Sequence, residues 1–405
     1  MLRLAIIVLL TASHSFAQPP IPADLKSLYD AQKWKELHAA LSKSKGADLY
    51  CGAVAVIFHQ NPRRAESLLR SAIKSAPESN QAYEAYEWLS HLYLYTGQYR
   101  RLISTMEARW AAFPEKGENE KERNELAGLR GLPDQITERV RPSILQHEEK
   151  SIFIPVTVNN QSATFFFDTG AWVSSISESE AKRLGLRFTD ISGKVGSMTN
   201  SAAYRGAVAD QLAVGNVHLR NVSFAVFPDT SEPWSMLPAG RRGILGIPII
   251  VALRTLRWAH DGTVRLGGRT TAFDPGKSNL TFDDDHLVVT AVIQGRNASA
   301  LVDTGAETTD LFAECAKQFP RLVESGKKDT TEVRAVGGAA SYDSITLSEL
   351  PIEVGGLPLL LRPAHILLSR SQGPHIGNFG IDLWMQGRAF SFDFTAMTLQ
   401  IEPKK

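Results

Sequence analysis

Two aspartates in this sequence are each followed by the same three residues. The two segments, Asp168–Ala171 and Asp303–Ala306, both read Asp-Thr-Gly-Ala and stand 135 positions apart. Two carboxyl groups held close together cannot both ionise easily, so they share one proton over a broad pH range. The ionised group can then accept a proton from water while the neutral group donates a hydrogen bond. The repeated motif therefore indicates acid–base chemistry that needs one carboxyl from each copy.

The residues in front of the two motifs are repeated in the same register. A shift of 135 positions places one neighbourhood on the other without a gap. In each copy a strand-like segment, a two-residue turn and an apolar segment lead into the aspartate, which predicts a β-hairpin. The paired segments are Ile152–Val158 with Leu287–Ile293, Asn159–Asn160 with Gln294–Gly295, and Phe165–Phe167 with Ala300–Val302.

A second pair of landmarks lies downstream of the motifs. Gly246 ends the segment Ile244–Gly246, 78 residues after the first aspartate, and Gly380 ends Asn378–Gly380, 77 residues after the second. Each glycine is followed by isoleucine and then by a further strand-like segment, at Thr255–Trp258 and at Ala389–Phe392. A repeat of this size indicates a duplicated lobe rather than a solenoid unit.

An apolar segment entering Asp-Thr-Gly-Ala, with two apolar residues and a glycine downstream, resembles the retropepsin-like and pepsin-like aspartic proteases. The resemblance covers roughly residues 145–403, although Phe379–Gly380 stands where Leu-Gly is usual. It implies an all-β, two-lobed acid-protease fold and an aspartic endopeptidase. Asp168 and Asp303 would form the catalytic dyad, and water would attack the peptide carbonyl without an acyl-enzyme. No metal and no cofactor is expected.

The resemblance also implies roles for the other motif residues. Thr169 and Thr304 would turn their hydroxyls inward and bond across the interface between the lobes. The supporting glycines would be Gly170 and Gly305, which turn the chain after each acid, and Gly246 and Gly380, which let the downstream strand pass beneath each aspartate loop.

Two glycine-containing segments occupy matching places after the acids. Val195–Gly196 and Val336–Gly337 resemble the family's flaps, the hairpins that close over substrate and exclude water. The alternative for both segments is an ordinary surface hairpin.

Residues 22–130 have a different pattern, in which apolar residues such as Leu25, Leu28 and Leu37 recur at helical spacing. The segment from Trp88 to Pro114 resembles a tetratricopeptide repeat; the alternative is a helical hairpin with an ordinary core. We therefore expect an N-terminal all-α helical-repeat domain before the β lobes. The expected ranges are 1–17 for a signal peptide, 22–130 for the tetratricopeptide-like domain, 145–268 and 285–403 for the lobes, and 269–284 for a linker.

The first residues predict export. A short basic start, the apolar run Leu4–Leu10 and the small residues of Ser15–Ala17 are typical of a signal peptide, with the mature chain beginning at Gln18. The expected location is the periplasm or the exterior. The formal net charge of +1 gives no indication of nucleic-acid binding or of an anionic membrane surface, and no segment is long enough for membrane insertion.

Several smaller features favour structural roles. Cys51 and Cys315 fall in different expected domains and are interpreted as buried free thiols, although their pairing stays open. The acidic cluster Asp283–Asp285 lacks the remaining ligands of a calcium loop and is interpreted as part of a solvated linker. The histidines, among them His375, are interpreted as surface or capping residues.

Two functional hypotheses follow. In the first, the chain is an active single-chain endopeptidase with a polypeptide substrate, monomeric because its two lobes form a pseudo-dimer. In the second, it is a non-catalytic peptide- or protein-binding relative that acts through its helical repeats and has a decayed second lobe. Retention of both aspartates and both threonines favours the enzyme. In either case the helical repeats could bind a protein partner.

Overall fold

The N-terminal part of the chain is helical. The computed structural model describes residues 23–42, 44, 46–116, 120–148, 151–196, 201–335 and 338–404, so the expected signal peptide lies outside the described residues. The helices of this N-terminal part are α1 (Ala23–Asp30), α2 (Trp34–Leu41), α3 (Asp48–Ile57), α4 (Pro62–Ser75), α5 (Asn80–Tyr95), α6 (Tyr99–Ala112) and α7 (Glu120–Ala127), with a 3-10 turn at Pro114–Lys116.

The starts of α4 and α5 follow from local sequence signals. The side chain of Asn61 accepts a hydrogen bond from the Arg64 amide at 3.2 Å, and Pro62 fills the first helical position. Ser79 accepts from the Ala82 amide at 3.1 Å and begins α5. These side chains satisfy amides that would otherwise lack a partner at the helix N-termini.

The rest of the described chain is dominated by strands, which form three sheets. The first sheet contains β1 (Ile136–Val140), β8 (Val217–Phe227), β5 (Ser175–Ser177), β9 (Gly243–Leu245), β4 (Gln161–Phe167), β3 (Phe153–Val158), β7 (Ser201–Val214) and β6 (Arg187–Gly196), in that order. The second contains β16 (Lys327–Ala335), β17 (Gly338–Leu347), β20 (Ala364–Leu367), β15 (Asp310–Phe312), β21 (Gly377–Phe379), β14 (Arg296–Val302), β13 (His286–Ile293), β18 (Leu350–Val354) and β19 (Leu357–Leu361), with β12 (Leu280–Asp283) beside β13. The third contains β2 (Ser143–Gln146), β11 (Thr263–Leu266), β10 (Thr255–Ala259), β22 (Ala389–Asp393) and β23 (Thr398–Glu402).

Short helices connect several of these strands. They are α8 (Glu178–Arg183), α9 (Ile247–Ala252), α10 (Ala313–Gln318), α11 (Pro320–Ser325) and α12 (Ile381–Trp384), with a 3-10 turn at Trp234–Met236. In the part of the chain that the structure describes, no helix is long and apolar enough to cross a membrane.

The first and second sheets repeat one arrangement of strands. In the first, β3 and β4 form a hairpin, and β4 pairs in parallel with β9, which returns antiparallel to β5. In the second, β13, β14, β21 and β15 make the same pairings. Both hairpins turn through two residues with positive φ, Asn159–Asn160 and Gln294–Gly295, as type I′ turns require. The predicted hairpins before the two motifs are therefore confirmed.

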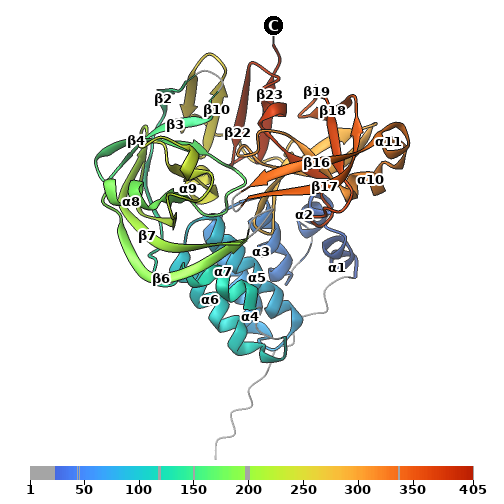
Figure 1. The fold of residues 1–405 in the computed structure, drawn as a ribbon. Helices are drawn as coiled ribbons and strands as arrows, with labels where there is room; N and C mark the ends of the chain where they lie inside the picture. Colours follow the sequence, from blue (N-terminus) through green and yellow to red (C-terminus); the bar gives the residue numbers. More distant parts are fainter. Residues whose placement is uncertain are drawn as a thin grey trace, which may run out of the picture.

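The third sheet joins the two halves of the β region. β10 and β22, the two strand-like segments predicted downstream of the glycines, pair with each other antiparallel. Leu256 lies opposite Phe392, Arg257 opposite Ser391 and Trp258 opposite Phe390. Figure 1 shows these strands between the two large sheets.

Two of the expected boundaries are wrong. The sheet region begins before residue 145, because β1 at Ile136–Val140 pairs with β8 of the first sheet. The expected linker 269–284 is not solvated throughout: β12 pairs with β13, and Leu280 and Phe282 are fully buried. Alternation of these two apolar residues with polar neighbours is a strand pattern that the adjacent acidic residues obscured.

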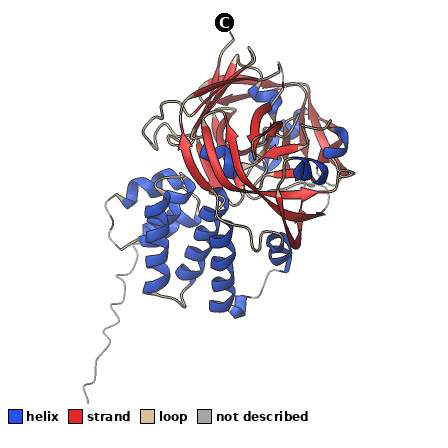
Figure 2. Cartoon of the chain, turned by 90° about the vertical axis from the view of Figure 1, so that its left-hand side faces the viewer, coloured by secondary structure: helices blue, strands red, loops and turns tan. Residues whose placement is uncertain are grey.

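The helical region packs against the sheets rather than standing apart (Figure 2). Tyr95 of α5 stacks on Phe282 of β12, with ring centroids 4.2 Å apart. Gln135, just before β1, accepts at its carbonyl from the Gln98 side chain and donates through Nε2 to the Pro248 carbonyl at 2.9 Å. Pro248 is the second residue of α9, which begins directly after Gly246. The N-terminal region therefore contacts the segment that follows the first glycine landmark.

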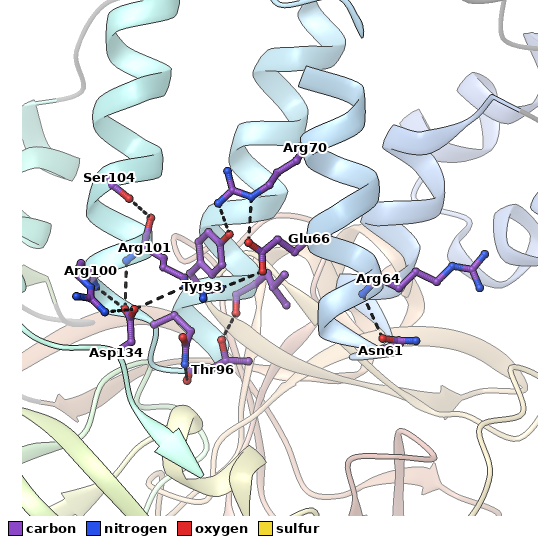
Figure 3. Close-up of polar contacts among 12 residues, drawn as sticks. Asn61, Arg64, Glu66, Arg70, Tyr93, Thr96, Arg100, Arg101, Ser104 and Asp134 are labelled. Atoms are coloured by element: carbon purple, nitrogen blue, oxygen red, sulfur yellow. Dashed lines mark hydrogen bonds and ion pairs between the residues drawn. The ribbon is translucent and has the colours of Figure 1, made fainter. Parts of the chain in front are cut away.

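Asp134 strengthens this junction by capping α6 from outside the helix (Figure 3). Its Oδ1 accepts from the amides of Arg100 and Arg101 at 3.0 and 3.3 Å, and its carboxylate also pairs with both guanidinium groups. Arg101 reaches Glu66 of α4 at 3.1 Å as well. The network joins α4 and α6 to the segment that enters the first sheet.

Candidate active site

The two motif aspartates begin matching loops at the ends of β4 and β14. The Asp168 amide donates to the Leu245 carbonyl at 3.1 Å, and the Asp303 amide donates to the Phe379 carbonyl at 3.0 Å. Each aspartate is thus fixed by the strand that carries its own glycine landmark. Asp168 and Asp303 are both half-buried as whole residues.

The structure brings the two motifs into direct contact. A Cβ placed on Gly170 would lie 2.6 Å from Cγ of Asp303, and one placed on Gly305 would lie 2.5 Å from Cγ of Asp168. Each glycine therefore leaves the space that the opposite carboxyl group fills.

The threonines cross between the two loops. Thr169 Oγ1 donates to the Val302 carbonyl at 2.7 Å and accepts from the Thr304 amide at 3.0 Å. Thr304 Oγ1 donates to the Phe167 carbonyl at 2.8 Å and accepts from the Thr169 amide at 3.1 Å. Both side chains are buried, at 1% and 0% exposed. Four reciprocal hydrogen bonds thus fix the positions of the two loops relative to each other.

The glycine landmarks pass directly under the loops. A Cβ on Gly246 would lie 2.6 Å from the Ala171 carbonyl oxygen, and one on Gly380 would lie 2.6 Å from the Thr308 carbonyl oxygen. Because these neighbours are backbone atoms, a larger residue could not be accommodated by moving a side chain.

Two hydroxyl residues at this contact were missed by the sequence analysis. Ser174 Oγ accepts from the Gly246 amide at 3.0 Å, and Thr309 Oγ1 accepts from the Gly380 amide at 2.9 Å. Both are buried, and both stand at the same offset after their aspartate. The matching offset was the signal that could have identified them.

The electrostatic environment favours a shared proton. Burial and, secondly, the neighbouring Asp303 carboxylate raise the pKa of Asp168 well above the usual range for aspartate, and the amides of Gly170 and Ala171 only partly oppose this. A carboxyl group in these conditions holds its proton at a pH where a solvated aspartate is ionised. The pair can therefore keep a proton at a pH where two solvated aspartates would both be ionised.

The expected flaps are described only in part. Val195 and Gly196 lie at the end of β6, where their backbones pair with Ala202 and Ser201 of β7. Val336 and Gly337 lie outside the described residues. β6 also contacts the helical region, since a Cβ on Gly193 would lie 2.6 Å from the Gly128 amide nitrogen.

His375 was interpreted as a surface or capping residue, and a surface position is wrong. It is 6% exposed, its Nδ1 lies 3.0 Å from Ser299 Oγ, and its Nε2 lies 3.1 Å from Asp283 Oδ2. The expected solvated acidic cluster is therefore partly engaged in contacts within the fold. Cys51 and Cys315 are both free; Cys315 is buried as expected, whereas Cys51 is half-buried.

Among the described residues, no three His, Cys, Asp or Glu side chains gather in a way that could hold a metal ion. A hollow of about 520 Å³, lined by Pro155, Thr164 and Arg241 among others, includes none of the motif residues.

Comparison with known proteins gives matches over part of the chain. Residues 154–249 match a family model described as aspartyl protease. Among solved structures, the chain is similar to a retropepsin-like aspartic protease from Rickettsia conorii, with 18% identity and a TM-score of 0.24. That similarity covers 32% of this chain and 93% of the other. No curated protein matches the chain.

Proposed function

We propose that this chain is a single-chain aspartic endopeptidase whose two lobes each supply one aspartate. The observation that carries the proposal is the contact of the two Asp-Thr-Gly loops, with each carboxyl group against the glycine of the other loop. The raised pKa of Asp168 supports a shared proton, and the aspartyl protease match of residues 154–249 supports the reaction class.

The proposed reaction uses one ionised and one neutral carboxyl group. The ionised carboxyl accepts a proton from a bound water as the water oxygen forms a bond to the peptide carbon. The neutral carboxyl donates its proton toward the carbonyl oxygen. Collapse of the resulting gem-diol breaks the C–N bond, and the leaving amine takes up a proton. The carboxyl groups are regenerated without a covalent intermediate.

The remaining parts of the chain have proposed roles that fit this activity. Val195–Gly196 and Val336–Gly337 would form flaps over a polypeptide substrate. The tetratricopeptide-like helices would bind a protein partner, and a signal peptide at residues 1–17 would direct the protein to the periplasm or the exterior. The site needs no metal and no second chain, so the protein would act as a monomer.

A cleavage assay tests the proposal. The purified chain is incubated with a denatured protein between acidic and neutral pH, with and without a statine-type mimic of the gem-diol intermediate. The expected result is cleavage that the mimic suppresses. Absence of cleavage across this range, or cleavage that the mimic does not affect, would contradict the proposal and favour a non-catalytic binding protein.

Amide variants of the two aspartates identify the groups responsible. Asp168→Asn and Asp303→Asn should each abolish cleavage, and the double variant should be no worse than either single one, because the two groups act as a unit. Activity retained in Asp303→Asn would mean that the second lobe is decayed. Specific activity that falls steeply on dilution would then show that a second chain completes the site.

A further inference from the structure

The two aspartates accept different sets of hydrogen bonds. Asp168 Oδ1 accepts from the Gly170 amide at 2.8 Å, and Asp303 Oδ1 accepts from the equivalent Gly305 amide at 2.8 Å. Asp303 Oδ1 also accepts from the Ala306 amide at 3.0 Å. The equivalent amide in the first loop, that of Ala171, acts on Asp168 and lowers its pKa. Among the described residues, Asp303 has an additional side-chain donor: Nδ2 of Asn378 lies 2.7 Å from its Oδ2.

The position of Asn378 is occupied by Ile244 in the other half of the β region. Asn378 lies opposite Leu301 in the parallel pair of β21 and β14, and Ile244 lies opposite Phe166 in the parallel pair of β9 and β4. Leu301 and Phe166 each stand two residues before an aspartate. Ile244 has no polar side-chain atom, so it cannot donate an equivalent bond to Asp168.

Asn378 is placed where its hydrogen bond has a strong effect. It is 4% exposed, and a buried amide is retained only when its polar atoms are bonded. An N–H aimed at a carboxyl oxygen stabilises the ionised form, because that form accepts hydrogen bonds on both oxygens. The bond therefore favours a negative charge on Asp303 over one on Asp168.

Charged groups on the neighbouring elements also act on the pair. The cations that act on Asp303 are Arg370, between β20 and β21, and His286 of β13. Burial opposes the protonated form of His286, but Asp285 beside it outweighs this and raises its pKa. Asp310 of β15, across from Asn378, is buried, and this raises its pKa and limits its negative charge. Both cations lie in the second half, and each also faces a carboxyl group there: His286 is paired with Asp285, and Arg370 lies near Asp310.

We propose that Asn378 is a positioning residue that places the negative charge of the dyad on Asp303 and leaves the shared proton on Asp168. The proposal rests on the proposed function and deepens it by assigning the two roles. Asp303 accepts the proton from water, and Asp168 donates its proton toward the substrate carbonyl. The additional hydrogen bond comes from one side chain, so it can be moved from one half of the site to the other.

Chemical labelling locates the charge without requiring peptide cleavage. An ionised carboxylate oxygen opens a small epoxide, forming an ester bond as the ring C–O bond breaks and the new alkoxide takes a proton from water. The intact chain is treated with such an epoxide near neutral pH, and peptide mass spectrometry measures the ester at each aspartate. The expected ratio favours Asp303 over Asp168 by about tenfold, as one charge-assisted hydrogen bond implies.

The matched variant exchanges the two side chains. In Ile244→Asn/Asn378→Ile the donor moves to the first half, and the labelling preference should move to Asp168. If the exchange impairs folding, as judged by thermal unfolding, Ile244→Asn alone serves, because it adds a donor to Asp168 and should bring the ratio close to one. Equal labelling in the native chain, or a ratio that neither variant changes, would overturn the proposal.

The pH dependence of cleavage supplies a second readout. Asn378→Leu should move the acidic limb of the kcat/KM profile upward by roughly half to one pH unit, because the reactive anion loses an N–H donor. Asn378→Ser, which can retain a donor, should restore much of the native profile. A uniform loss of activity with an unmoved limb would indicate a packing role and overturn the proposal. A native chain that cleaves nothing but labels asymmetrically would contradict only the proposed function.

Discussion

Gly170 lies so close to Asp303 that no side chain could stand between them. A Cβ at residue 170 would come within 2.6 Å of Cγ, 2.6 Å of Oδ1 and 2.9 Å of Oδ2 of that carboxyl group. Real Cβ contacts are longer than this, so the glycine is required by the neighbouring loop. The relationship is reciprocal, since Gly305 lies equally close to Asp168.

Gly170→Ala should therefore displace Asp303 and abolish cleavage. We expect a loss of about 1–3 kcal/mol in the free energy of unfolding, which is typical of overpacking, and a much larger proportional loss of kcat. The measurements are urea unfolding and steady-state kinetics. Gly268→Ala is the control, because a Cβ there would meet nothing nearer than Thr255 Oγ1 at 3.5 Å. Native activity in Gly170→Ala would contradict the close contact.

The raised pKa of Asp168 predicts how stability depends on pH. Native Asp168 holds its proton more tightly than the unfolded chain does, so the free energy of unfolding falls as pH rises. The fall begins near pH 4, where an unfolded aspartate titrates, and ends when the native group has lost its proton. Asp168→Asn cannot ionise and should not show this contribution.

The difference in Tm between Asp168→Asn and the native chain should therefore grow in favour of the variant as pH rises above about 4. Thermal unfolding measured at a series of pH values tests this. Asp210→Asn, at an exposed carboxylate paired with Arg187, is the control for a general charge effect. A Tm difference that stays constant or declines with pH would show that Asp168 ionises easily in the native state.

The crossed threonines predict a separate effect on stability. Thr169→Val keeps the shape of the side chain but removes the bond to the Val302 carbonyl and the acceptor for the Thr304 amide. Two buried polar groups would lose their partners, so we expect a loss of about 2–4 kcal/mol in the free energy of unfolding. Thr169→Ser retains the hydroxyl and should lose far less. Equal losses for Val and Ser would show that the methyl group, rather than the hydroxyl, matters.

The parts of the site that were predictable from the sequence are those in which residue type and spacing are both repeated. Asp168 and Asp303 share a motif, and the hairpin before each one has the same length, so their equivalence was apparent. Ser174 and Thr309 also share an offset, but their different residue types concealed it. Asn378 could not be assigned a role, because its contact with Asp303 depends on the register of β21 against β14.

The errors in the expected domain boundaries have a related cause. β1 lies before the duplicated segment, so the repeat contains no signal for it. Leu280 and Phe282 of β12 are buried partly by the helical region, where Phe282 stacks on Tyr95. His375 is buried against Ser299 and Asp283. The pairing of β1 and the burial of these side chains depend on contacts between segments far apart in the chain. Such contacts cannot be inferred from local sequence patterns.

The last prediction concerns the junction between the helices and the sheets. Gln135 is 7% exposed, and its Nε2 donates to the carbonyl of Pro248, two residues after Gly246. Gln135→Leu would leave that carbonyl without this donor and weaken the support of the segment beneath the Asp168 loop. We expect a loss of about 1–3 kcal/mol in the free energy of unfolding, together with a lower kcat.

Urea unfolding and cleavage kinetics measure the two effects on the full chain. Gln400→Leu makes the same chemical change at an exposed position of β23 and should leave both quantities close to native. If this junction had no influence on the site, Gln135→Leu would leave kcat unchanged. A joint loss of stability and kcat would instead indicate that the junction at Gln135 helps to hold the first aspartate loop in place, because Gln135 reaches that loop through Pro248 and the segment that carries Gly246.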